Sequence, residues 1–230
     1  MLSPRNDVEN IIMNDEIRLD LHEVTDREWK VYDLLKRLMD MVGAFIGIII
    51  LLPLLVTVSI IIKIDDPKGS VFYYQTRVGR DEKPFRMYKF RSMVRDADKQ
   101  LEQLLAQNEI KGAMFKMKHD PRITRIGRLI RKTSIDELPQ LVNVLRGDMS
   151  LVGPRPPLPR EVKEYTAYDK QRLSVTPGCT GLWQVSGRNE LSFGQMVELD
   201  LKYINKRSIV FDLLIILRTV KVLLGSKGAY

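Results

Sequence analysis

The chain has 230 residues and a formal net charge of +8 at pH 7, and this length suffices for one domain with its own core. Its 1 cysteine and 2 histidines offer no disulfide framework and argue against zinc chemistry and a Ser-His-Asp triad. The excess of basic residues points to anionic partners, which are lipid headgroups, phosphorylated substrates or nucleic acid.

The N-terminal third predicts a membrane segment. Residues 1–30 are acidic, and we expect them to be a partly helical extension; apolar residues then recur at helical spacing from Trp29 to Asp40. An uncharged run follows over residues 41–62, which at about 1.5 Å per residue is long enough to cross a bilayer. We expect this segment to be embedded in a membrane.

Pro53 lies near the middle of the run, and basic residues flank both ends. Basic flanks favour the cytoplasmic side, so a helix that enters, breaks at Pro53 and returns satisfies both ends. An ordinary single-pass helix that contains a proline is the alternative. Gly43 and Gly47 form a G-x-x-x-G pattern, a spacing that can pack two helices, so a homodimer stays open.

The remaining chain predicts a small α+β domain. Short strands are expected over residues 71–75 and 84–90, with a loop around Gly79. Loops are expected over residues 152–159 and 176–188, the second with one strand. Helices are expected over residues 92–117, 123–131, 136–146, 191–205 and 209–224, and the last is too short and too charged to span a bilayer, which suits an interfacial or core position.

Asp136 and Glu137 are adjacent acids behind a cationic run. Arg122, Arg125 and Arg128 recur every three residues, so one helix face is expected to present them to phosphates. Two neighbouring carboxylates suit Mg²⁺, which shares its oxygen ligands with substrate phosphates. The alternative is helix capping, with Asp136 at the N-cap and Glu137 in the first turn.

The loop over residues 153–157 is rigid, because Pro154 and Pro156 fix the backbone around Arg155. Such a loop can hold an arginine for an anion at little entropic cost, or it can be a stiff structural loop. The charged residues Arg77, Arg80, Lys89 and Arg91 near the expected strands suit a solvated or headgroup-facing surface. The sequence contains no Walker-type phosphate loop.

Three long stretches carry a family resemblance: VFYYQTRVGRDEKPFRMYKFRSM, DPRITRIGRLIRKTSIDELPQLVNVLRGDMSLVGPRPPL and TPGCTGLWQVSGRN. From about residue 31 to 224 the chain resembles bacterial sugar transferases, the monotopic polyprenyl-phosphate phosphoglycosyl transferases. The resemblance implies a mainly helical α+β fold, in which a re-entrant helix-break-helix over residues 31–64 carries a small globular catalytic domain with interfacial helices over residues 65–230. The family's break is commonly Ser-Pro, whereas this chain has Leu52-Pro53. Larger relatives carry further N-terminal spans, so we expect the minimal catalytic form.

The resemblance also implies a reaction. Members transfer hexose 1-phosphate from a UDP-sugar to undecaprenyl phosphate and release UMP, on the cytoplasmic face of the bacterial plasma membrane. The product would initiate exopolysaccharide, capsule or related glycan synthesis. The expected partners are the two substrates and anionic membrane lipid, with no nucleic acid. Glucose or galactose is the expected sugar, and N-acetylated sugars stay open.

By position, Asp136 matches the nucleophile that forms an aspartyl phosphosugar, and Glu137 matches the partner acid near Mg²⁺. Arg131 matches an arginine associated with the phosphates, and Arg155 falls in the family's Pro-Arg-Pro motif, which is linked to the nucleotide. The further expected positions are Lys89 and Arg128 for substrate, Pro154 and Pro156 as part of the motif, and Asp200 for metal.

Three rival hypotheses remain. The chain could be a membrane protein with a basic nucleic-acid-binding domain, which predicts salt-dependent binding to DNA. It could be a non-catalytic membrane scaffold for glycan assembly. Within the enzyme hypothesis, direct one-step transfer with Asp136 only as a metal ligand is the alternative mechanism.

Overall fold

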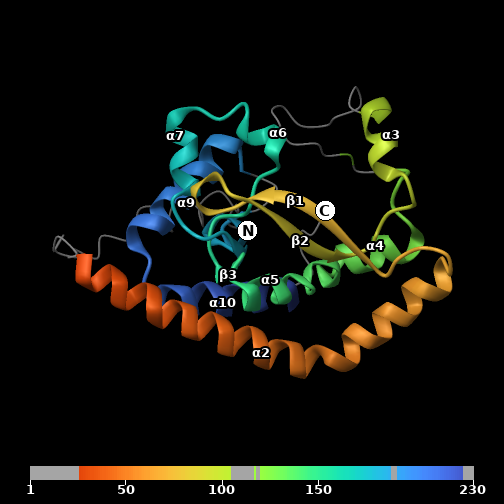
Figure 1. The fold of residues 1–230 in the computed structure, drawn as a ribbon, viewed down its shortest axis with the longest axis horizontal. Coiled ribbons are helices and arrows are strands. Elements are labelled where there is room, and N and C mark those ends of the chain that lie inside the picture. Colours follow the sequence, from red (N-terminus) through yellow and green to blue (C-terminus); the bar gives the residue numbers. More distant parts are fainter. Residues whose placement is uncertain (1–25, 105–116, 118–119, 188–190, 225–230) are drawn as a thin grey trace, which may run out of the picture.

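The computed structural model describes residues 26–104, 117, 120–187 and 191–224. They form a mainly helical α+β fold, in which one long apolar helix carries a small domain with two two-stranded sheets (Figure 1). This confirms the predicted fold class at that level. The acidic extension lies almost entirely outside the described residues. Residues 105–116 of the helix predicted over 92–117 also lie outside them. In the described part of that range, residues 92–96 are not helical and α3 (Ala97–Leu104) follows.

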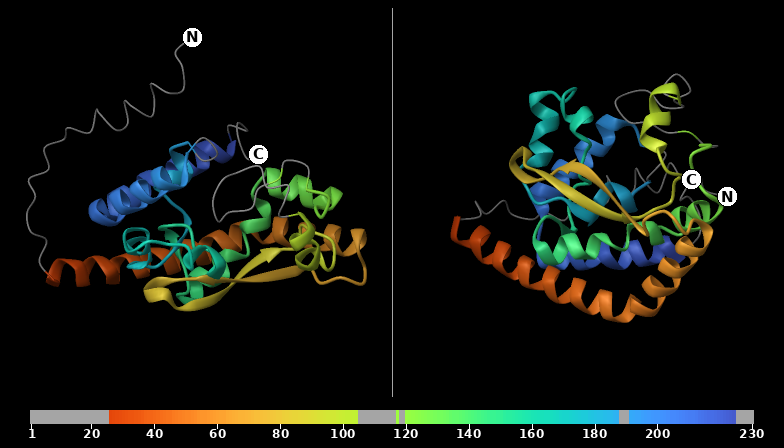
Figure 2. Two further views of the ribbon diagram at one scale, coloured as in Figure 1. Left: turned by 90° about the horizontal axis from the view of Figure 1, so that it is seen from above. Right: turned by 45° about the vertical axis from the view of Figure 1, so that its right-hand side comes forward.

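Both halves of helix α2 (Asp26–Asp65) contact the domain. In the first half, Ala44 packs against Val144, and in the second half Ile62 packs against Ile130. The helix is bent, and the domain lies along its concave side (Figures 1 and 2). The same domain therefore packs against α2 both before and after Pro53 in the sequence.

The bend has a local chemical cause. Pro53 lies inside α2, where it removes a helical hydrogen bond and clashes with the preceding turn. The Thr57 hydroxyl donates to the Pro53 carbonyl at 2.8 Å, and the Ser59 hydroxyl donates to the Leu55 carbonyl at 2.7 Å. Bonds of this kind to the preceding turn also bend helices.

The G-x-x-x-G pattern packs α2 against its own domain. A Cβ added to Gly43 would lie 2.7 Å from Leu151 Cδ1, and one added to Gly47 would lie 3.4 Å from Leu141 Cδ1. The two glycines thus permit close approach of the α5 and β3 region. The homodimer stays a prediction without support from this pattern.

The outer face of α2 is apolar and exposed. In the part of the chain that the structure describes, α2 is the one helix long and apolar enough to cross a membrane, and only 11% of its apolar window is buried. Helix α10 (Ile209–Leu224) contacts α2 and also exposes large apolar side chains. The exposed residues include Leu38, Phe45, Ile49, Ile50, Leu52 and Ile60 on α2, with Val210, Leu213 and Leu217 on α10.

The predicted strands form an antiparallel hairpin. β1 (Phe72–Val78) pairs with β2 (Pro84–Phe90), and Tyr74 lies opposite Tyr88. The 3₁₀ turn η1 (Arg80–Glu82) closes the hairpin. Lys89 lies one residue before the end of β2, and its side chain is largely buried.

The segment after the hairpin departs from two sequence predictions. Helix α4 (Arg125–Lys132) begins after its N-cap Thr124, so Arg122 lies outside it and the predicted face of three arginines is wrong. The helix predicted over 136–146 is divided into η3 (Ile135–Glu137) and α5 (Gln140–Arg146). Asp136 is therefore no N-cap of α5, because Pro139 occupies that position. Gly147 ends α5 as predicted, with φ 88°.

The rest of the domain covers a second, parallel pair of strands. β3 (Ser150–Val152) pairs with β4 (Gly178–Thr180). The first residue of the loop predicted over 152–159 therefore belongs to β3. β4 is the strand expected within the other loop, which also contains α8 (Leu182–Val185). Between the strands lie α6 (Pro159–Val162), α7 (Ala167–Lys170) and η4 (Gln171–Leu173). The predicted helix α9 (Phe193–Lys206) follows, and Tyr203 of α9 packs with Ile215 and Val152 in the core.

Candidate active site

A cavity of about 990 Å³ opens beside the hairpin and brings most of the predicted site residues together. Its lining includes residues of β1, β2, α3, α4, η3, α6, η4, α8 and α9 and of the loop over residues 155–158. Among the predicted residues, the lining includes Asp136, Glu137, Lys89, Arg131, Arg155 and Pro156. The tertiary structure thus assembles one site from segments far apart in the sequence.

A left-handed residue places the two carboxylates. Ser134 has φ 56° and ψ 15° and turns the chain from α4 into η3. Asp136 is 7% exposed and lines the cavity, yet its carboxyl group makes no hydrogen bond or ion pair within the described part of the chain. A buried carboxylate normally has a partner, so Asp136 is available to a ligand.

Two cations from different elements hold Glu137. Lys89 Nζ of β2 lies 2.7 Å from Glu137 Oε1, and Arg155 Nη2 lies 3.3 Å from the same oxygen. Asn143 of α5 fixes the neighbouring part of β2, because its Oδ1 accepts from the Tyr88 N–H at 2.9 Å and its Nδ2 donates to the Arg86 carbonyl at 2.7 Å. The site therefore has a rigid wall on the hairpin side.

Arg77 is a third cation of the site that the sequence analysis placed on the surface. Its side chain lines the cavity and is buried, and it donates to the Pro156 carbonyl at 2.9 Å and to Gln75 Oε1 at 2.8 Å. Burial, together with the charge of Arg155, lowers the pKa of Arg77 to about 10. Strand alternation alone did not mark it, because its neighbour Thr76 is also polar.

The two acids have opposite pKa shifts. Burial raises the pKa of Asp136 to about 6, and the Glu137 charge adds to this while Lys89 opposes it. Burial would also raise the pKa of Glu137, but Lys89 and Arg155 together lower it well below its ordinary value. Near pH 7 both groups are therefore charged, and only Asp136 is close to its titration range.

The carboxylates fit a divalent cation that is shared with a ligand. No group of three or more His, Cys, Asp or Glu side chains suited to a metal ion occurs in the described ranges. Mg²⁺, however, commonly takes one or two protein carboxylates and completes its shell with water and substrate phosphates. Asp136 can accept such an ion. Lys89 and Arg155 both bind Oε1 of Glu137.

Three predicted residues lie away from the carboxylates. Asp200 does not line the cavity; it is fully buried and paired with Arg172, and burial raises its pKa to about 6. Arg128 is exposed on α4 and lies outside the lining. Pro154 is buried, and its carbonyl accepts from the Gly178 N–H at 2.9 Å. The structure therefore gives Pro154 a contact that holds the loop to β4.

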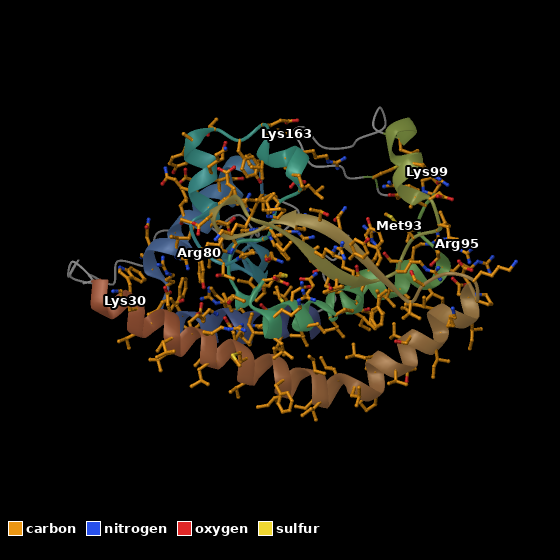
Figure 3. The ribbon with its side chains drawn as sticks, in the orientation of Figure 1. Lys30, Arg80, Met93, Arg95, Lys99 and Lys163 are labelled. Carbon is orange, nitrogen blue, oxygen red and sulfur yellow. The ribbon has the colours of Figure 1, made fainter. Side chains whose placement is uncertain are left out.

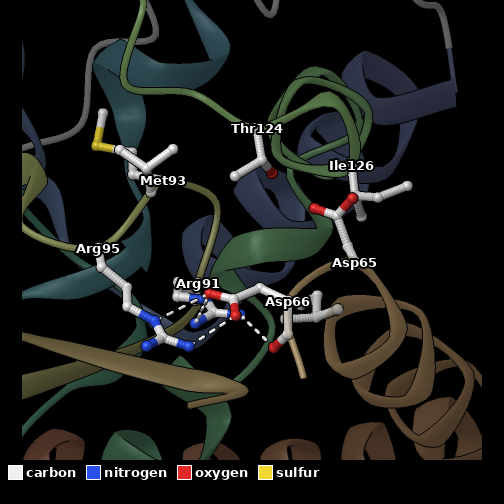
Figure 4. A pocket seen from close by; sticks show the side chains of 9 residues that line it. Asp65, Asp66, Arg91, Met93, Arg95, Thr124 and Ile126 are labelled. Atoms are coloured by element: carbon white, nitrogen blue, oxygen red, sulfur yellow. Dashed lines mark hydrogen bonds and ion pairs between the residues drawn. The ribbon is translucent and has the colours of Figure 1, made fainter. Parts of the chain in front are cut away.

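A smaller pocket lies where the chain leaves α2 (Figure 4). There Asp66 binds Arg95 through two contacts, at 2.7 and 3.1 Å, and Arg91 at 3.1 Å. Arg95 and Lys99 lie at the same end of the molecule (Figure 3). The large cavity reaches this basic end too, because Lys68, Arg91, Arg95 and Lys99 belong to its lining.

The opposite end of the cavity contains residues that the sequence analysis left without a role. This inner end is lined by Arg160, Glu161, Tyr165, Arg172, Trp183 and Met196. They come from α6, η4, α8, α9 and the loop after α6. Their spacing along the chain, 36 residues from first to last, gives no periodic signal.

Comparison with known proteins identifies a family and several relatives. The family model described as "Bacterial sugar transferase" matches residues 31–226. "Galactosyl transferase CpsE" of Streptococcus agalactiae serotype III is 51% identical over 195 residues, which cover 84% of this chain and 43% of that protein. "Undecaprenyl-phosphate galactose phosphotransferase" of Salmonella typhimurium is 46% identical over 200 residues, 85% of this chain and 42% of that protein. "Exopolysaccharide production protein ExoY" of Rhizobium meliloti is 39% identical over 199 residues, 85% of this chain and 88% of that protein. The chain thus spans less than half the length of the first two relatives and most of the third.

Proposed function

The chain belongs to the bacterial sugar transferase family, and we propose that it transfers hexose 1-phosphate from a UDP-sugar to undecaprenyl phosphate, releasing UMP. The observation that carries the proposal is the buried Asp136 beside Glu137, in a cavity lined by Lys89, Arg77 and Arg155. Among the described residues, the Asp136 carboxyl group has no hydrogen-bond or ion-pair partner. This combination supplies a carboxylate nucleophile and the cations that a diphosphate needs. The product would initiate exopolysaccharide synthesis, the process named for the Rhizobium meliloti relative, or the synthesis of a capsule or related glycan.

The mechanism has two displacement steps at one phosphorus atom. In the first step an Asp136 carboxylate oxygen attacks the phosphorus that bears the sugar. The bond to UMP breaks, and UMP leaves with the electron pair. In the second step a phosphate oxygen of undecaprenyl phosphate attacks the same phosphorus. The bond to Asp136 breaks, and the free carboxylate returns with the lipid-linked diphosphosugar as product.

The basic residues stabilise charge during both steps. Arg77, Arg131 and Arg155 line the cavity near the carboxylates, and arginine pairs well with phosphate oxygens. Glu137 keeps Lys89 and Arg155 in position. Asp136 and Glu137 would hold Mg²⁺, which when bound neutralises charge on the diphosphate.

We further propose that α2 is re-entrant and that the domain lies on the cytoplasmic face of the bacterial plasma membrane. The support is that one domain contacts α2 before and after Pro53, so both helix ends lie on the same side of a membrane that takes the apolar outer face. The exposed apolar residues of α10 suit the interface, and the net positive charge suits anionic lipid. UDP-sugars are cytosolic and the lipid acceptor is in the bilayer, so a site at this boundary can bind both.

Galactose is the proposed sugar, because the names of two relatives contain the words galactose or galactosyl. The test is UMP release by purified protein in lipid nanodiscs with undecaprenyl phosphate and Mg²⁺, with UDP-galactose beside UDP-glucose and the N-acetylated donors. We expect release with UDP-galactose and accumulation of a lipid-linked diphosphosugar. Folded protein that releases no UMP with any donor supports the scaffold hypothesis instead.

The topology has its own test. Cysteine introduced at exposed Lys30 or Lys68, one on each side of the apolar run, is labelled in inverted and in right-side-out membrane vesicles. Both positions should react from the cytoplasmic side only. Reaction of the two positions from opposite sides supports the straight single-pass alternative.

A further inference from the structure

The inner end of the cavity, defined above, is lined by buried groups that the proposed mechanism does not use. Trp183 is 8% exposed, and its Nε1 has no hydrogen-bond partner in the described part of the chain. The Nε atoms of Arg160 and Arg172 are likewise buried without a partner there. All three residues line the cavity, and buried N–H donors without a partner among the described residues are costly unless a ligand supplies acceptors.

The same end also holds an acceptor and apolar surface. Glu161 is buried, and its Oε2 accepts from the Leu158 N–H at 2.8 Å, so the carboxylate is held at the cavity wall. Arg172 donates to the Tyr165 hydroxyl at 3.2 Å, so this hydroxyl, which accepts from Arg172, can also donate. Met196 lines the same region. Mixed donors and acceptors beside an aromatic ring suit a ring that carries several hydroxyl groups.

The donor substrate contains two such rings, the hexose and the ribose of uridine. The first displacement separates them, because UMP must leave while the sugar phosphate stays on Asp136. Glu161, Arg172 and Trp183 are each less than a tenth exposed, whereas Lys68, Arg95 and Lys99 at the basic end are exposed. The more enclosed inner end suits the group that stays, because the leaving nucleotide needs an open path.

We propose that the inner end binds the hexose of the nucleotide sugar and that the Trp183 N–H donates a hydrogen bond to a sugar hydroxyl, making Trp183 a specificity-determining residue. The inference rests on the proposed function and adds the part of the substrate that this end binds. Sugars that differ in the orientation of one hydroxyl are then discriminated, because the wrong epimer leaves a buried donor unpaired. The basic end with Lys68, Arg91 and Arg95 is left for the phosphate of the lipid acceptor.

The chain allows a direct test because it contains only 2 tryptophans. The second, Trp29, lies in α2 and contacts Tyr32 and Arg207 outside the cavity. In the Trp29→Phe variant, Trp183 is the single fluorophore. We expect UDP-galactose to change its emission and UMP, which has ribose but no hexose, to leave it unchanged. An equal change with UMP would overturn the assignment to the hexose.

A kinetic arm uses Trp183→Phe, which removes the N–H and retains an aromatic ring, with Trp29→Phe as the matched control. We expect the preference for UDP-galactose over UDP-glucose, as a ratio of kcat/KM values, to fall about tenfold in Trp183→Phe, because one neutral hydrogen bond is lost. The inhibition constant of UMP and the unfolding midpoint should not change, and Trp29→Phe should match the parent in all three. An unchanged ratio overturns the inference even if UMP release persists. Absence of UMP release together with absence of any emission change overturns this inference and the proposed function alike.

Discussion

Two buried clusters of charged residues in this molecule have similar groups but differ in how fully those groups are paired. At the junction of α2 and α10, Lys36 Nζ lies 3.0 Å from Asp40 Oδ1 and 3.1 Å from Asp212 Oδ2. Tyr203 donates to Asp212 at 2.8 Å, and the Leu151 N–H donates to Asp40 at 3.0 Å. Every charged group there has a protein partner, so the cluster anchors one half of the membrane helix.

The cluster at the candidate active site is less complete in its pairing. Glu137 has two cationic partners, but its neighbour Asp136 has none within the described residues. The first cluster therefore exchanges water for protein partners, whereas the second keeps capacity for a ligand. The comparison teaches that burial of charge alone does not mark function; an unsatisfied group that faces a cavity does.

The largest effect should follow from Asp136→Asn. An amide is no nucleophile towards phosphorus, so we expect UMP release to fall by at least about 10³-fold. The unfolding midpoint should stay the same or rise, because a buried charge without a protein partner is removed. Activity is measured as UMP release and stability by thermal unfolding in nanodiscs. Retention of activity within tenfold would favour the one-step alternative, as would failure to trap a phosphosugar on Asp136.

Lys36→Met should have the opposite profile, with a large loss of stability. It leaves Asp40 and Asp212 buried without their cation, which costs about 3–5 kcal/mol in free energy of unfolding. Adding Asp212→Asn should restore part of this loss, because one unpaired charge is then removed. Denaturant titration measures both variants. If Lys36→Met lowers the free energy of unfolding by less than 1 kcal/mol, on the scale of an exposed pair, the anchor hypothesis is wrong.

A smaller effect is expected in the pH dependence of activity, which involves Asp136. The nucleophile must be ionised, and the pKa of Asp136 is raised to about 6 by burial. We therefore expect kcat/KM to fall about tenfold per pH unit below that value. Because the folded pKa lies above the ordinary one, this group favours the native state at low pH and ceases to do so as pH rises through about 6.

Mg²⁺ should shift this pH dependence. A cation bound at the carboxylates favours their ionised forms, so a higher Mg²⁺ concentration should move the midpoint of the profile to lower pH. Rates are measured across pH 5–8 at two Mg²⁺ concentrations. A midpoint that does not respond to Mg²⁺ would argue against Asp136 and Glu137 as its ligands.

The smallest effect is expected at an exposed pair, which serves as the baseline. Lys170 lies 3.1 Å from Glu82, and their side chains are 41% and 52% exposed. Lys170→Ala should change the free energy of unfolding by less than about 1 kcal/mol and leave UMP release unaltered. A larger change would mean that the contact between η1 and the α7 region carries more of the fold than its exposure suggests.

Local patterns were enough to predict much of this protein. The apolar run with Pro53, the strands of the hairpin, α9 and α10 follow from periodicity and flanking charge, which act over a few residues. The adjacent acids and the Pro-Arg-Pro loop were visible as motifs, and the family follows from their order along the chain.

Contacts between distant residues were decided only by the tertiary structure. Lys89 and Glu137 are 48 residues apart, and the sequence analysis assigned Arg77 to a charged surface although it is buried behind Pro156. Asp136 looked like a helix cap until the left-handed Ser134 and the N-cap at Pro139 placed it in η3 instead. Trp183 lies in one of the three motif stretches but received no role from the sequence, and Arg172 had no local signal. Periodicity indicates which face of one helix or strand is buried. Which groups meet across elements depends on how those elements pack, and this packing determines the partners of the buried charges.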